Sequence, residues 1–131
     1  MEKFFAPNNS YESLPDFRLH VDVNEGAEEG FYPPMLKFIV SDSGEIFVAG
    51  VEFHKDIRPE IQRENLLGAG TIAFNPDAAT NDNLLHISQW HSTGYGIKTS
   101  EEVTEKIKPI ILNSFDEFEK AKLIDPTFLV R

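Results

Sequence analysis

Two histidines, a tryptophan, a tyrosine and several hydroxyls gather in the stretch HISQWHSTGYGIKTSEE, residues 86–102. Within it, His91, Ser92 and Tyr95 are the side chains able to act as acid, base or nucleophile. His54, in FHKDI, is an upstream histidine that could join them. Together they would suit a small transferase or hydrolase acting on a phosphate-bearing ligand. The alternative is that the stretch is only a strand-to-helix corner.

The hydroxyls and glycines of this stretch are typical of a turn that accepts an anion. It contains four candidate ligand-binding residues, Thr93, Gly94, Gly96 and Thr99. The first free N–H groups of the helix expected after them favour a phosphate or a carboxylate. A purely structural interpretation explains the same residues, because glycines let the chain turn and hydroxyls satisfy backbone groups.

Other chemical motifs are weak in this sequence. The four histidines show neither HxxxH nor HExxH spacing, so we expect no metal ion and no cofactor. Ser92, His54 and Asp56 could be drawn as a triad, but no GxSxG elbow surrounds the serine. An ADP-ribosyltransferase-like interpretation would use HSTGY with Glu101 or Glu102, although a helix cap already explains Glu102.

The composition describes an acidic chain without cysteine. Its 131 residues include 22 acidic and 12 basic side chains, which gives a net charge of −10. Such a charge repels phosphate backbones, so we expect no nucleic-acid binding and favour a protein partner that is basic. The absence of cysteine excludes a disulfide framework and a thiolate zinc site. With no signal peptide or membrane-length apolar run, we expect a cytoplasmic protein that does not bind membranes.

Hydrophobic patterning predicts a series of strands. They cover FRLHVDV (17–23), MLKFIV (35–40), EIFVAGVEF (45–53), LLGAGTIAF (66–74) and LLHISQW (84–90). The second and third form a hairpin around SDSG. We expect residues 1–16 to be a flexible arm before a single domain, 17–131, and residues 24–30 to be an acidic loop that could face a partner.

After Thr99 the period becomes that of a helix. Its predicted buried face consists of Val103, Ile107, Ile111, Phe115 and Phe118. Thr99 and Glu102 match a capping box with Thr99 as N-cap. Because Pro109 should kink or interrupt the helix, two short helices, roughly 100–107 and 114–122, compete with one kinked helix. The order of elements predicts an α+β fold, a mostly antiparallel curved sheet with this helix or helix pair packed on one face.

Three blocks have the order and spacing of a known domain. They are FHKDI around His54, GAGTI (68–72) and ISQWHSTGYGIKTSEE (87–102). From about Lys37 to Ile111 they resemble a domain of bacterial polymorphic toxins, secreted effectors and plant IQ-motif calmodulin-binding proteins. The corresponding elements of that domain read HSS, AAGxI and IS-x-x-SGHY-x-P-[ST]-x-E.

The sequence departs from that pattern in each of its polar elements. HSTGY, beginning at His91, stands in place of SGHY, and Lys55 and Asp56 stand in place of the paired serines. The proline before Thr99 is absent. The resemblance implies a compact β-rich domain in which His54 and the turn 91–95 converge, and it implies no single activity.

Two functions therefore remain open. The leading one is a small, non-catalytic interaction or regulatory domain with a protein partner, in a toxin or effector context. The alternative is the transferase or hydrolase, with a small anionic ligand at the turn 91–96. A shared cleft for His54 and the turn, with His91 in hydrogen-bond reach of Ser92 or Tyr95, would favour the enzyme.

Overall fold

The computed structural model describes residues 14–75 and 85–125. Most of the predicted arm, residues 76–84 and residues 126–131 lie outside the described residues. Where the description begins, Leu14 and Phe17 pack against the main hydrophobic core.

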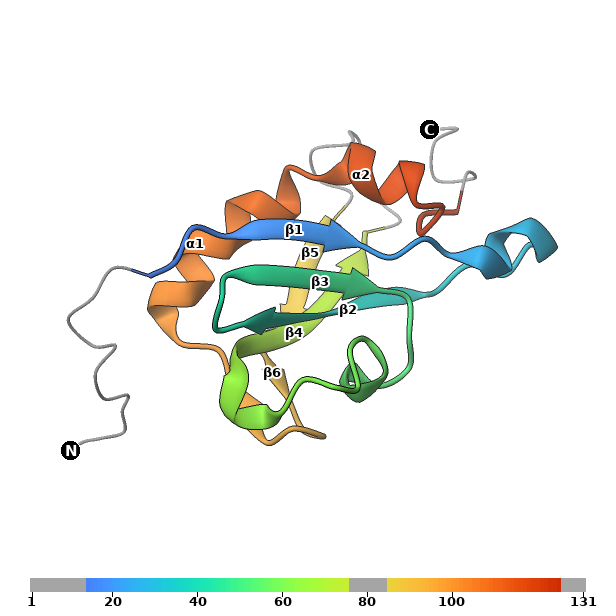
Figure 1. The fold of residues 1–131 in the computed structure, drawn as a ribbon. Helices are drawn as coiled ribbons and strands as arrows, with labels where there is room; N and C mark the ends of the chain where they lie inside the picture. Colours follow the sequence, from blue (N-terminus) through green and yellow to red (C-terminus); the bar gives the residue numbers. More distant parts are fainter. Residues whose placement is uncertain (1–13, 76–84, 126–131) are drawn as a thin grey trace, which may run out of the picture.

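Five strands form one mixed sheet (Figure 1). They are β1 (Arg18–Val21), β2 (Met35–Ser41), β3 (Glu45–Ala49), β4 (Leu66–Phe74) and β5 (Leu85–Gln89). Their spatial order is β1-β3-β2-β4-β5, with β2 and β3 forming the predicted hairpin. All neighbours are antiparallel except β1 and β3, which are parallel. A projecting segment with the short 3-10 helix η2 (Glu25–Glu29) connects β1 to β2.

Two helices cover one face of the sheet, as the amphipathic pattern predicts (Figure 1). They are α1 (Glu101–Leu112) and α2 (Phe115–Lys120). All five residues of the predicted helical face are buried, and Phe118 is fully so. They pack on Leu36, Phe38 and Val40 of β2 and on Ile46 and Val48 of β3. The predicted α+β fold class is confirmed.

The opposite face of the sheet is also buried, under the irregular segment after β3. This segment contains η3 (His54–Asp56) and η4 (Arg63–Asn65), and its Ile57 packs with Ile39 and Phe47 of the sheet. Arg58 donates to both carboxylate oxygens of Asp22, at 2.8 and 2.9 Å, and its guanidinium lies 4.4 Å from the centre of the Phe47 ring. This ion pair ties the segment to the end of β1.

Of the two arrangements left open, the structure has the two helices, but the break between them does not fall at Pro109. Helix α1 continues through Pro109 to Leu112, and the Pro109 carbonyl accepts from the N–H of Asn113 at 3.0 Å. A proline removes one helical hydrogen bond. Burial of Ile107 and Ile111 on either side of it offsets that loss. The break comes instead at Asn113, before α2.

Neither described helix has the length and hydropathy needed to cross a membrane.

Candidate functional site

The strand-to-helix corner contains a small hairpin that sequence patterning did not predict. After β5 the chain forms β6 (His91–Ser92), turns, and returns as β7 (Ile97–Lys98) before α1 begins. Gly96 adopts φ 71° at the turn, and its N–H lies 2.8 Å from the Ser92 carbonyl oxygen. A positive φ suits glycine, which explains why Gly96 stands here.

The structure brings His54 and part of the turn together. His54, His91, Ser92, Thr93 and Gly94 line one cleft of about 290 Å³, here called the corner cleft. It lies on the sheet face opposite the helices, and no residue of α1 lines it. The convergence of His54 with the turn is therefore present, but the helix N-terminus takes no part in the cleft.

His54 is engaged with the backbone of β4. It is buried, and its Nε2 lies 2.7 Å from the carbonyl oxygen of Gly70. Because a carbonyl only accepts, Nε2 carries the proton and donates it. Burial lowers the pKa of His54, and the charges of Lys37 and His91 lower it further, although the Gly70 hydrogen bond acts the other way. The ring is therefore neutral at neutral pH and leaves only Nδ1 with a free lone pair.

Ser92 is not placed as a nucleophile. Its side chain is buried, and its Oγ accepts from the N–H of Tyr95 at 3.2 Å. Among the residues that the structure describes, no hydrogen bond joins the ring of His91 to Ser92 or Tyr95, and none joins Ser92 to His54. The hydroxyl therefore shapes the turn, and neither the drawn triad with Asp56 nor a Ser–His pair is assembled.

Thr99 is not the helix cap. The N-cap is Ser100, whose Oγ accepts from the N–H of Val103 at 3.3 Å. Thr99 is buried instead against β4, where its Oγ1 accepts from the N–H of Ala69 at 2.9 Å and donates to the Ala69 carbonyl at 2.8 Å. A Cβ at Gly68 would come within 2.6 Å of that hydroxyl oxygen. Thr99 thus pairs with the edge of β4 in place of a neighbouring strand and is closed to ligands.

Tyr95 and Gly96 lie outside the corner cleft. Tyr95 packs against the hydrophobic cluster under the 50–65 segment and lines a separate groove with Ile61 and Arg63. Burial raises the pKa of Tyr95, with a further contribution from nearby carboxylates, so its phenol stays neutral at neutral pH. Arg63 fixes the turn by donating to the Gly96 carbonyl at 3.0 Å.

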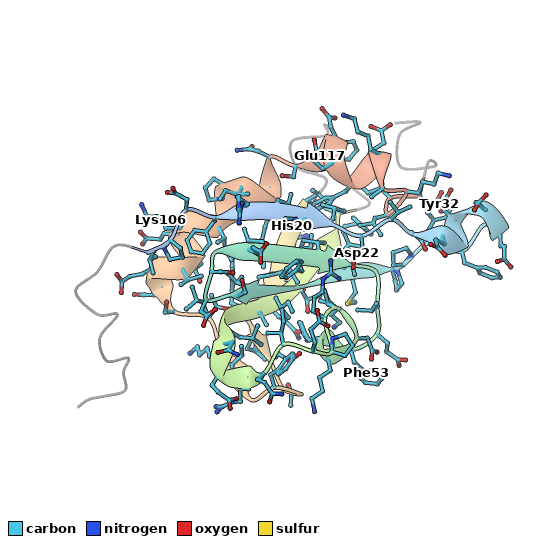
Figure 2. All side chains as sticks on the ribbon, in the orientation of Figure 1. His20, Asp22, Tyr32, Phe53, Lys106 and Glu117 are labelled. Atoms are coloured by element: carbon cyan, nitrogen blue, oxygen red, sulfur yellow. The ribbon has the colours of Figure 1, made fainter. Side chains whose placement is uncertain are left out.

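A surface that the sequence patterning missed lies at one end of the sheet. In the described part of the chain, the large apolar side chains that are exposed are Val23 (62%), Phe31 (70%), Met35 (40%) and Phe53 (61%). Val23 follows β1, Phe31 precedes β2, Met35 begins β2 and Phe53 follows β3. Because β1 and β3 are parallel and β2 is antiparallel to β3, these segments leave or enter the sheet at the same end. Figure 2 shows Tyr32 on the projecting segment and Phe53 apart from it, beside the short helix η3, and both far from Lys106. We call Val23, Phe31, Met35 and Phe53 the apolar end.

The first predicted strand, 17–23, is longer than the observed strand, and Val23 lies outside it. Strand β1 stops at Val21, so the alternation of the sequence continues beyond the paired backbone. The sequence signal for the apolar end was the pair Phe31-Tyr32, which directly follows the acidic residues 24–30. Aromatic residues next to charged ones are typical of an exposed binding surface.

Asn24 anchors the projecting segment between β1 and β2, which carries Phe31. Its Nδ2 donates to the carbonyls of Phe31 at 2.9 Å and Lys122 at 3.1 Å, while its Oδ1 accepts from the N–H of Gly26 at 3.1 Å. Its own N–H bonds the Ala121 carbonyl at 2.8 Å. The projection is therefore anchored to the end of α2.

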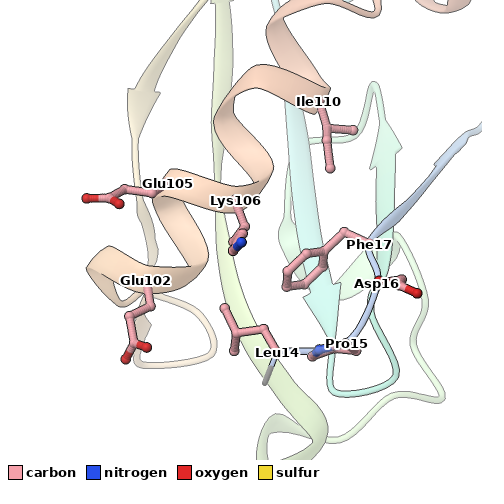
Figure 3. Close-up of a pocket in the computed structure, with 8 residues that line it drawn as sticks. All are labelled: Leu14, Pro15, Asp16, Phe17, Glu102, Glu105, Lys106 and Ile110. Atoms are coloured by element: carbon pink, nitrogen blue, oxygen red, sulfur yellow. The ribbon is translucent and has the colours of Figure 1, made fainter. Parts of the chain in front are cut away.

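A third hollow lies between the first described residues and α1 (Figure 3). Leu14, Phe17 and Ile110 give it apolar walls, and Glu102 and Lys106 lie on the helix beside it. The residues that line this hollow form no acid–base pair and no other catalytic arrangement, so it adds no catalytic candidate.

Across residues 14–75 and 85–125, no three His, Asp or Glu side chains gather in a way that could hold a metal ion. Comparison of the chain with protein-family models, with curated proteins and with solved structures gives no match.

Proposed function

We propose that the protein is a non-catalytic interaction domain that binds a basic, partly apolar protein segment at the apolar end. One observation carries the proposal, namely that the large apolar side chains exposed in the described chain all lie in segments that leave or enter the same end of the sheet. Exposed apolar groups gathered in one place are a feature of protein-binding surfaces, and aromatic residues are enriched in the cores of interfaces.

The charge beside these side chains defines the partner. Glu25, Glu28 and Glu29 precede Phe31 in the sequence, and Glu52 precedes Phe53. Asp22, close by, is already neutralised by Arg58. A partner with lysines or arginines around apolar side chains would match both the charges and the apolar groups.

The anchoring of the projection favours binding. Because Asn24 ties its two sides to each other and to the end of α2, Phe31 is presented on a held backbone. A surface ordered before binding loses less conformational entropy on association.

The state of the predicted catalytic residues supports a non-catalytic role. His54 donates to Gly70, Ser92 accepts from Tyr95 and Thr99 is paired with Ala69. The transferase or hydrolase interpretation therefore lacks an assembled nucleophile and base. A toxin or effector context, suggested by the resemblance, and a cytoplasmic location both stay predictions.

The proposal is tested with two synthetic amphipathic peptides, one of lysine and leucine and one of glutamate and leucine. The lysine peptide should bind and shift the amide resonances of residues 23–35 and 50–53, and the glutamate peptide should not bind. Combining Phe31→Ser with Phe53→Ser should weaken binding of the lysine peptide at least about tenfold, because buried aromatic anchors contribute most to such interfaces.

A matched pair of charge reversals separates local from overall electrostatics. Glu28→Lys and Glu105→Lys change the net charge equally, but Glu28 lies in η2 and Glu105 lies in α1. Only Glu28→Lys should weaken binding markedly. Equal effects of the two reversals, or shifts spread over the whole acidic surface, would contradict the proposal.

A further inference from the structure

We infer that the corner cleft is a binding site for a small anion with a phosphate or carboxylate group, held by Lys37, Lys55 and the tip of the β6–β7 hairpin. This site adjoins the proposed protein-binding surface, because Phe53 of the apolar end also lines the cleft, but Val23, Phe31 and Met35 do not line it. It also differs from the site expected from sequence, because neither the helix N-terminus nor Thr99 takes part in it.

The walls of the cleft include residues from four places in the chain. Lys37 comes from β2, Lys55 from η3, and His91 and Thr93 from the hairpin and its turn. Gln89, at the end of β5, also lines it. Side chains able to donate hydrogen bonds therefore surround a space of about 290 Å³, in which a phosphate group fits with room for a small substituent.

Lys37 is positioned by a polar chain along the sheet. Its Nζ donates to Thr71 Oγ1 at 3.4 Å, and that hydroxyl donates to Gln89 Oε1 at 3.2 Å. Lys37 interrupts the otherwise apolar run MLKFIV on a half-buried part of β2, which was the sequence signal for it. The ammonium group is thus held in place on a half-buried part of the strand.

The two lysines have no carboxylate partner. Within the described residues, neither Lys37 nor Lys55 forms an ion pair, although the chain has 22 acidic side chains. Glu52 is the acidic residue that lines the cleft, against two lysines. Lys37 also lies near the buried wall, since its charge adds to the effect of burial in lowering the pKa of His54. An anion would supply the missing counter-charge.

The overall charge of −10 opposes an anion only at long range. At physiological salt the interaction of exposed charges is screened beyond about 8 Å, so the lysines inside the cleft dominate for a bound ligand. Charge-assisted hydrogen bonds from ammonium groups to phosphate or carboxylate oxygens are among the stronger polar contacts in proteins.

The test is a titration of the ¹⁵N-labelled protein with inorganic phosphate, adenosine monophosphate and acetate, each compared with sodium chloride at equal ionic strength. A saturable shift of the amides of residues 54–55 and 91–94 is expected with phosphate or with acetate. The stronger of these two identifies the group that is bound, and adenosine monophosphate reports whether the cleft accepts a larger substituent.

Variants tie the signal to the cleft. Lys37→Gln and Lys55→Gln should each weaken binding about tenfold, through loss of one charge-assisted hydrogen bond. Lys108→Gln removes the same charge from α1, on the other side of the sheet, and should leave the affinity unchanged. Phe31→Ser should also leave it unchanged, so that failure of this site and failure of the protein-binding surface are distinguishable. Absence of saturation, or an equal loss with Lys108→Gln, would overturn the inference.

Discussion

Replacing Thr99 with valine should destabilise the fold far more than loss of a helix cap. Valine has nearly the same shape as threonine but no hydroxyl, so the buried N–H and carbonyl of Ala69 both lose their partner. Each unpaired buried group costs about 1–3 kcal/mol, which gives about 2–6 kcal/mol in total. Thr99→Ser keeps the hydroxyl and should cost only about 1 kcal/mol for the lost methyl group.

Urea unfolding followed by circular dichroism measures these differences at equilibrium. Ser100→Ala, which removes the observed cap, provides the reference and should cost about 1 kcal/mol. If Thr99→Val costs no more than Ser100→Ala, or if Thr99→Ser is as damaging as Thr99→Val, the hydroxyl does not hold the edge of β4.

Two further predictions concern the core and the buried histidine. Phe118→Ala empties a fully buried position and should lower the free energy of unfolding by about 3–5 kcal/mol; a loss below about 1 kcal/mol would mean that α2 does not pack as described. Because the folded-state pKa of His54 lies below its unfolded value, the unfolded chain binds the proton first. Stability should therefore fall as the pH drops from about 6.5 toward the folded pKa, and His54→Gln, whose amide can still donate to Gly70, should show a smaller fall over that range. Parallel pH curves for the two proteins would refute this assignment.

Local sequence patterns predicted where the strands lie in the chain better than they predicted which strands pair in the sheet. The predicted strand 66–74 has the same first and last residues as β4. This central strand consists of small and apolar residues and pairs with β2 on one side and β5 on the other. The parallel position of β1 beside β3 was not predictable, since alternation gives the two faces of a strand and not its neighbour. The second buried face had a signal in the unbroken apolar runs FIV and IFVA, which suit strands covered on both sides.

The candidate site shows the same division. The sequence led to His54 and the turn, and the structure places His54 and residues 91–94 around one cleft. It did not reveal that Thr99 binds Ala69, thirty positions earlier, because the Thr99 to Glu102 spacing also matches a cap. The sequence does not distinguish a hydroxyl that hydrogen-bonds to distant backbone from a hydroxyl that binds a ligand.

The central claim is that His54, Ser92 and Thr99 serve the fold, and the imidazole of His54 tests it most directly. Two-bond ¹H–¹⁵N correlation spectra distinguish the three protonation forms of a histidine ring. At neutral pH the structure predicts a neutral His54 with the proton on Nε2, donated to Gly70, and an unprotonated Nδ1. A ring protonated on both nitrogens, or on Nδ1 alone, would show that His54 is free of the β4 backbone and would contradict the account.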